Sequence, residues 1–115
     1  MKRILIVDDE EDIGTLMGGI FRSEGYEVDC AMTAEQALAF LKNNSYGTVF
    51  LDINLGSSDG LDLVPAINAR LPDERVVVVS AYGDRAVREA VETAGIIHFV
   101  LKPFSKLQVL NSLEK

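Results

Sequence analysis

Short apolar runs alternate with helix-like patterns along the chain, and this alternation constrains the fold more than any other feature. Alternation of this kind implies parallel strands joined by right-handed crossovers, with helices on both faces of one sheet. The chain has 115 residues, which suits one such domain and is too short for two ordinary ones. The sequence therefore predicts a single doubly wound α/β domain. We expect its five strands at 4–7, 26–30, 48–51, 75–80 and 96–101.

Apolar residues at helical spacing mark five helices between and after these strands. We assign all of these stripes to the core. The stripes include Ile13, Leu16, Met17, Ile20 and Phe21, then Leu38 and Leu41, then Leu61, Val64, Ile67 and Leu71, then Val87 and Val91, and finally Leu107, Leu110 and Leu113. We predict capping boxes at Thr33–Gln36 and Ser105–Gln108 and cap glycines at Gly25 and Gly95. Pro65 requires the third helix to start late.

Polar side chains follow the expected strands at their carboxyl ends. A block of five consecutive acids, beginning with Asp8 and Asp9, comes directly after the first strand, and Asp52 follows the third. Ser80 ends the fourth strand and Lys102 follows the fifth. Because the carboxyl ends of parallel strands share one edge of a sheet, we expect these five side chains to share a pocket.

Three carboxylates in one pocket require positive charge. At an effective dielectric of about 20, each like-charged pair about 4 Å apart costs about 4 kcal/mol. Lys102 alone cannot balance three negative charges, so the sequence predicts a divalent cation, with Mg²⁺ the best fit and Mn²⁺ a substitute. Glu10, Glu11 and Asp12 fall at the start of the first helix, where the macrodipole favours negative charge, and we predict that they are solvated there.

A carboxylate beside Mg²⁺, a hydroxyl and a lysine suits phosphoryl transfer. Asp52 can attack phosphorus and form an acyl phosphate. Lys102 and the Ser80 hydroxyl would then hold the phosphoryl oxygens, so that catalysis is mostly positioning and charge stabilisation.

These residues, in this order, make the chain similar to the receiver domain of two-component response regulators over essentially its whole length. The matching motifs are Asp8–Asp9, the stretch VFLDINLGSSDG at 49–60, Ser80 before Ala81, and LKPF at 101–104. The resemblance implies a flavodoxin-like, five-stranded parallel sheet of (βα)₅ type in the order 2-1-3-4-5. It also implies one receiver domain over 1–115, with room for an output domain beyond that position.

The resemblance assigns roles at the site. Asp52 would be the phosphoacceptor and a metal ligand, Asp9 a direct Mg²⁺ ligand, and Asp8 a ligand through water. Asn54 would offer its backbone carbonyl to the metal. Ser80 would turn inward to hydrogen-bond the phosphoryl group.

Further positions follow from the same resemblance. Lys102 would pair with the phosphoryl group, and the Lys102–Pro103 bond would be cis. Phe99 would be the switch aromatic, working with Ser80, although it lacks the hydroxyl of a tyrosine. Gly60 falls at the glycine expected after the acceptor loop. Gly56 replaces the proline that is usual there, which should loosen that loop.

One bulky residue near the acceptor has a predicted modulating role. Tyr82, two residues past Ser80, would overhang the acceptor pocket opposite Asn54. We predict that its ring obstructs the water that attacks the acyl phosphate and so prolongs the phosphorylated state.

The function that fits is a phosphorylation-dependent signalling switch and not a turnover enzyme. A sensor histidine kinase or a histidine phosphotransfer protein would supply the phosphoryl group. The fourth helix, fifth strand and fifth helix would then change affinity for a downstream effector, a fused output domain or a second copy of the chain. An aspartate-nucleophile phosphatase is one alternative, but Asn54 stands where that class has a general acid. A receiver that only binds proteins is the other.

Charge and cysteine content limit the setting of the domain. The net charge of −7 argues against direct binding of nucleic acid or an anionic membrane by this domain. Cys30 is the single cysteine, which favours a reducing compartment, and we assign it to the core. With no signal-peptide pattern, the sequence predicts a cytoplasmic protein.

Overall fold

The computed structural model of the chain describes residues 2–56, 58–70 and 75–113. Five parallel strands form the central sheet in the order β2-β1-β3-β6-β7. Counted along the chain, this is the predicted order 2-1-3-4-5. The strands are β1 (Arg3–Val7), β2 (Glu27–Ala31), β3 (Thr48–Leu51), β6 (Val76–Ser80) and β7 (His98–Leu101). In the described part of the chain, no helix is long and apolar enough to cross a bilayer.

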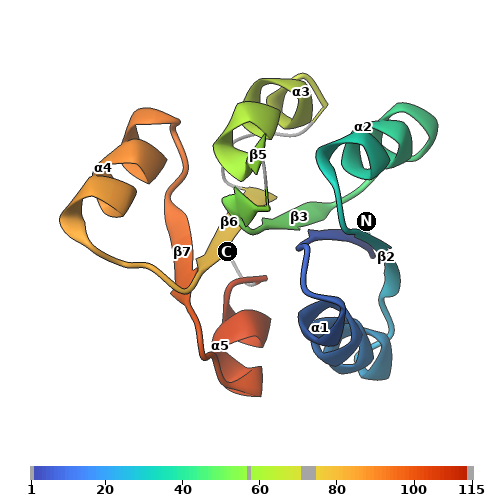
Figure 1. Ribbon diagram of the computed structural model, residues 1–115. Helices are drawn as coiled ribbons and strands as arrows, with labels where there is room; N and C mark the ends of the chain where they lie inside the picture. The colour runs from blue at the N-terminus through green and yellow to red at the C-terminus, as the bar shows by residue number, and fades with distance from the viewer. Residues whose placement is uncertain (1, 57, 71–74, 114–115) are drawn as a thin grey trace.

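Helices cover both faces of this sheet (Figure 1). One face carries α1 (Glu11–Ser23) and α5 (Lys106–Asn111), and the other carries α2 (Ala34–Asn43), α3 (Val64–Asn68) and α4 (Arg85–Thr93). The uninterrupted apolar run of β1 is explained by this arrangement. Leu5 and Val7 pack into the core beneath α2 and α3, while Ile4 and Ile6 pack into the core beneath α1 and α5.

The helix boundaries follow the predicted local signals. Ser105 and Gln108 form a complete capping box at the start of α5. Thr33 accepts a hydrogen bond from the Gln36 amide, but the Gln36 side chain accepts from Met32 instead of from Thr33, so α2 has only half of a box. Gly25 and Gly95 follow α1 and α4 with positive φ, as cap glycines do.

The third helical segment is split. A 3₁₀ turn, η1 (Gly60–Leu63), precedes α3, and Pro65 lies in the first turn of α3, as predicted. Leu71, which we assigned to the same stripe, lies outside the described residues. The segment between β3 and η1 also forms a small antiparallel hairpin of β4 (Asn54–Leu55) and β5 (Ser58–Asp59), which the sequence analysis did not predict.

Three leucines assigned to the core are exposed instead. Leu16, Leu38 and Leu107 have exposed fractions of 53%, 45% and 66%. Successive residues of a helix are about 100° apart, so an apolar stripe can be wider than the part that touches the sheet. In α5 the buried position is Val109, two residues and more than half a turn from Leu107.

The assignment of Cys30 to the core is also wrong, because the residue is exposed. It lies on β2, an edge strand of the sheet. Its Sγ faces the backbone carbonyl of Gly14 at 3.7 Å. Gly14 has no side chain, so the backbone of α1 approaches the thiol closely, and a Cβ at this position would lie 3.5 Å from Sγ.

Candidate functional site

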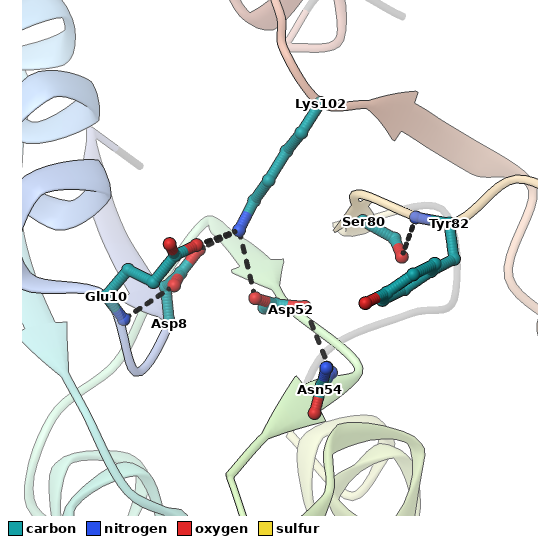
Figure 2. Close-up of polar contacts among 7 residues, drawn as sticks. All are labelled: Asp8, Glu10, Asp52, Asn54, Ser80, Tyr82 and Lys102. Atoms are coloured by element: carbon teal, nitrogen blue, oxygen red, sulfur yellow. Dashed lines mark hydrogen bonds and ion pairs between the residues drawn. The ribbon is translucent and has the colours of Figure 1, made fainter.

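The four predicted strand ends meet at one edge of the sheet. Asp8 follows β1, Asp52 follows β3, Ser80 is the last residue of β6, and Lys102 follows β7. Asp8, Asp52 and Ser80 are all buried, with exposed fractions of 4%, 5% and 0%. Figure 2 shows Asp8, Asp52 and Lys102 pointing toward one another.

Lys102 is the centre of the polar contacts. Its Nζ lies 2.9 Å from Oδ2 of Asp8, 3.0 Å from Oδ2 of Asp52 and 3.1 Å from Oε1 of Glu10. Burial by itself lowers the pKa of Lys102, but the hydrogen bonds to Asp8 and Asp52 outweigh it, so the pKa is raised above its usual range. The lysine is therefore held as a cation.

The acids around Lys102 fit a divalent cation. Ligand oxygens of Asp8, Glu10 and Asp52 all lie within 4.8 Å of one another. Three carboxylates face a single ammonium group, so one positive charge is too few for the cluster. Hard oxygen ligands and a negative excess are what Mg²⁺ and similar ions prefer.

Glu10 is the member of this group that the sequence analysis missed. We predicted a solvated acid at the helix start, and its side chain is indeed 63% exposed, yet it reaches Lys102. The Glu10 amide donates to Oδ1 of Asp8 at 2.9 Å, which turns the loop back over the site. The available signal in the sequence was the place of Glu10 two residues after Asp8, the acid that we expected to point into the pocket.

Asp9 is oriented differently from Asp8. It is exposed, and among the described residues it is not part of the group within 4.8 Å. Its Oδ2 lies 3.6 Å from the position that a Cβ on Gly56 would take. The Asp9 carboxylate is thus beside the hairpin that follows Asp52.

Asp52 is held by its own loop as well as by Lys102. Its Oδ1 accepts a hydrogen bond from the Asn54 amide at 3.0 Å. Burial raises the pKa of the Asp52 carboxyl, and the hydrogen bonds from Asn54 and Lys102 oppose that rise. The carboxylate is therefore a buried charge that added cations would stabilise.

Gly60 allows the acceptor loop to close on itself. Its amide donates to the Ile53 carbonyl at 2.6 Å. A Cβ at position 60 would lie 2.8 Å from Cα of Ile53 and closer still to the carbonyl oxygen of Asp52. Gly56 adopts φ +63° in the hairpin, a conformation that glycine takes readily.

Ser80 and Tyr82 lie at the end of β6 and in the loop that follows it. Ser80 is fully buried, and its Oγ accepts a hydrogen bond from the Tyr82 amide at 3.0 Å. The Tyr82 side chain is 57% exposed, and Figure 2 shows its ring turned toward the side where Asp52 and Asn54 lie. Asn54 itself is exposed.

The remaining predicted positions lie on and after β7. Phe99 is half-buried against the core that α4 covers. The Lys102–Pro103 peptide bond is cis, as predicted. The carbonyl of Ser80 accepts the Lys102 amide at 2.7 Å, which ties the end of β6 to the end of β7.

This geometry agrees with the family comparison. The sequence matches the response regulator receiver domain over residues 4–114. The chain belongs to the response regulator receiver domain family. This receiver domain has the fold of the family, whose members act in two-component signalling.

Several known proteins are similar to this receiver domain. The nitrogen assimilation regulatory protein NtrX of Azorhizobium caulinodans is 40% identical over 89% of the chain, which covers 23% of that protein. Sporulation initiation phosphotransferase F of Bacillus subtilis is 30% identical over 99% of the chain, which covers 92% of that protein. The beryllofluoride-activated NtrC4 receiver domain dimer is 32% identical with a TM-score of 0.88, covering 99% of this chain and 94% of that one.

The chain spans 23% of the length of NtrX and 61% of the photosynthetic apparatus regulatory protein RegA of Rhodobacter capsulatus. It spans nearly all of the sporulation phosphotransferase at 92%. The receiver fold therefore occurs among its relatives both beside other segments and almost by itself.

Proposed function

We propose that this receiver domain is a phosphorylation-dependent switch in which Asp52 accepts a phosphoryl group. A sensor histidine kinase or a histidine phosphotransfer protein would donate the group. The observation that carries the proposal is the buried Asp52 carboxylate at a strand end, 3.0 Å from the Lys102 ammonium. The similarity to a protein named as a phosphotransferase supports it.

The chemistry is an in-line displacement at phosphorus. A carboxylate oxygen of Asp52 forms the new O–P bond while the P–N bond to the donor imidazole breaks, and its electron pair stays on the nitrogen. Lys102, now on Oδ2 of Asp52, would move onto a phosphoryl oxygen. Ser80 would turn from its own loop to donate to another oxygen.

A divalent cation completes the charge balance. When bound, Mg²⁺ would neutralise charge that develops on the phosphoryl oxygens. We propose Asp9 and Asp52 as direct ligands, Asp8 as a ligand through water, and the Asn54 carbonyl as a further ligand. The position of Asp9 supports this arrangement, because its carboxylate lies beside the hairpin that carries Asn54. Lys102 forms its described ion pairs with Asp8, Glu10 and Asp52 and leaves Asp9 to the metal.

The output surface that we propose is formed by α4, β7 and α5. Large apolar side chains are exposed on or next to these elements: Tyr82 at 57%, Ile97 at 72%, Leu101 at 42% and Leu107 at 66%. Exposed apolar groups of this size suit a protein partner. The partner would be an effector, a fused output domain or, on phosphorylation, a second copy, since the beryllofluoride-activated NtrC4 receiver domain is a dimer.

Receiver domains are generally signalling switches and not turnover enzymes, and the acceptor loop favours that reading here. An aspartate-nucleophile phosphatase needs an acid two residues after the nucleophile. That position holds the amide of Asn54, which has no carboxylic proton to give. A single cysteine and an acidic composition agree with a cytoplasmic switch of this kind.

Phosphodonor labelling tests the proposal. Acetyl phosphate and Mg²⁺ should label the chain once, and borohydride trapping with mass spectrometry should place the label on Asp52. The Asp52→Ala variant should not be labelled, whereas a variant of the exposed Asp62 should be labelled normally. Many turnovers of the donor would favour the phosphatase, and no label would favour a receiver that only binds proteins. A label on another residue would refute the assignment.

A further inference from the structure

Arg88 contacts two separate segments next to the acceptor site at once. Its Nε donates a hydrogen bond to the carbonyl of Gly83 at 3.0 Å, in the loop between Ser80 and α4. Its guanidinium carbon lies 4.6 Å from the ring centroid of Phe99, on β7. One exposed side chain thus links the loop that begins at Ser80 to the aromatic residue on the neighbouring strand.

The loop fits closely against β7 at the point where Arg88 holds it. A Cβ on Gly83 would lie 2.9 Å from Cδ1 of Leu101 and 3.4 Å from Nη2 of Arg88. Gly83 is therefore enclosed by β7 on one side and by the arginine on the other. The loop cannot shift far without separating the Gly83 carbonyl from the guanidinium.

The same loop engages the Ser80 hydroxyl in a local hydrogen bond. Oγ of Ser80 accepts the amide hydrogen of Tyr82, within the loop, at 3.0 Å. On the proposed function, Ser80 has to turn toward the phosphoryl group on Asp52, and the residues up to Gly83 would follow. The contacts of Arg88 therefore stabilise the loop conformation in which Ser80 bonds to the Tyr82 amide.

We propose that Arg88 is a positioning residue that clamps the loop at Gly83 and the Phe99 ring in the resting state of the switch, an inference that rests on the proposed function above. The clamp joins loop and ring, so that release of one releases the other. Phe99 has no hydroxyl with which to hold itself in place, and the cation above its ring supplies a contact instead. A contact present mainly in one state shifts the equilibrium toward that state.

The clamp predicts that loss of Arg88 makes activation easier. A ligand that binds only the active state binds with an apparent affinity reduced by the fraction of molecules in that state. Beryllofluoride with Mg²⁺ mimics the phosphoryl group and can be titrated while amide chemical shifts are followed. One hydrogen bond and one exposed cation–π contact together correspond to about a three- to tenfold change in this fraction.

The decisive comparison is between Arg88→Met and Arg85→Met. Both variants remove one arginine from α4, but Arg85 has a 91% exposed side chain and pairs with Glu89 instead of the loop. We expect Arg88→Met to lower the half-saturating beryllofluoride concentration about three- to tenfold relative to Arg85→Met. Arg88→Lys, which keeps a cation near the ring but has no planar donor, should lie between the parent protein and Arg88→Met.

The beryllofluoride titrations test the clamp and the proposed function separately. If the half-saturating beryllofluoride concentration of Arg88→Met were equal to or higher than that of Arg85→Met, the clamp would be overturned. The proposed function would remain intact. Absence of any response in the unaltered protein would overturn the proposed function and the clamp with it. Melting temperatures check that the variants are folded, and the ring-proton shifts of Phe99 report directly whether the cation has left the ring.

Discussion

The ammonium nitrogen of Lys102 lies 3.0 Å from Oδ2 of Asp52, although the two residues are 50 positions apart. The same nitrogen contacts Asp8 at 2.9 Å, so one cation serves two buried carboxylates. A metal ion that binds here has to compete with Lys102 for these oxygens. Lys102 thus neutralises part of the negative charge that Mg²⁺ would otherwise neutralise.

Replacing Lys102 with Met should therefore strengthen Mg²⁺ binding and weaken phosphorylation. Without the ammonium, the carboxylates repel one another and any added cation gains more by binding. We expect Mg²⁺ to raise the melting temperature of Lys102→Met by more than that of the parent protein, and labelling of Asp52 to be about tenfold slower or worse. Lys106→Met, an exposed lysine on α5, is the control. Weaker Mg²⁺ binding in Lys102→Met would contradict the competition.

Neutralising Asp9 and Glu10 one at a time should identify the metal ligand. Asp9→Asn and Glu10→Gln each remove one charge from the same loop. We expect Asp9→Asn to abolish Mg²⁺-dependent chemical-shift changes, whereas Glu10→Gln keeps them, because the Glu10 side chain is 63% exposed and contacts Lys102 instead. The chain has no tryptophan, so tryptophan fluorescence cannot serve as the readout. The reverse result would transfer the ligand role to Glu10.

Gly60→Ala should unfold the acceptor loop or destabilise the domain. The added Cβ would meet the backbone of Asp52 and Ile53, which cannot yield as a flexible side chain can. We expect a loss of about 2 kcal/mol or more in the free energy of unfolding, measured with urea. Gly19→Ala is the matched control, because a Cβ there meets nothing within 4 Å and alanine favours the helix by about 1 kcal/mol. Equal stability of the two variants would refute the steric argument.

Removing the Tyr82 ring should shorten the lifetime of the phosphorylated state. The ring is turned toward Asp52 and Asn54 while its side chain is largely exposed, so it can obstruct the attacking water without touching the metal. After the donor is removed, label should be lost several-fold faster from Tyr82→Ala than from the parent, and Tyr82→Phe should behave like the parent. An unchanged half-life in Tyr82→Ala would show that the ring is not a shield.

The sequence was sufficient for the five strands of the central sheet, the fold class and the core of the site, whereas the hairpin of β4 and β5 was not predicted. Strand ends can be read from short apolar runs, and parallel strands bring their carboxyl ends to one edge. The meeting of Asp8, Asp52, Ser80 and Lys102 follows from those two facts alone. Gly60 was predicted from the resemblance, and its reason, a close approach to the acceptor backbone, became visible only in three dimensions.

The tertiary structure decided which side chains reach across between elements. Periodicity indicates the side of a helix that is apolar but not how much of it the sheet covers, so Leu16, Leu38 and Leu107 were wrongly assigned to the core. The contact of Glu10 with Lys102 depends on a loop that turns back, and the contact of Arg88 with Phe99 depends on how α4 lies against β7. Contacts of this kind join residues distant in the sequence, and local patterns carry no information about the rotamers that make them.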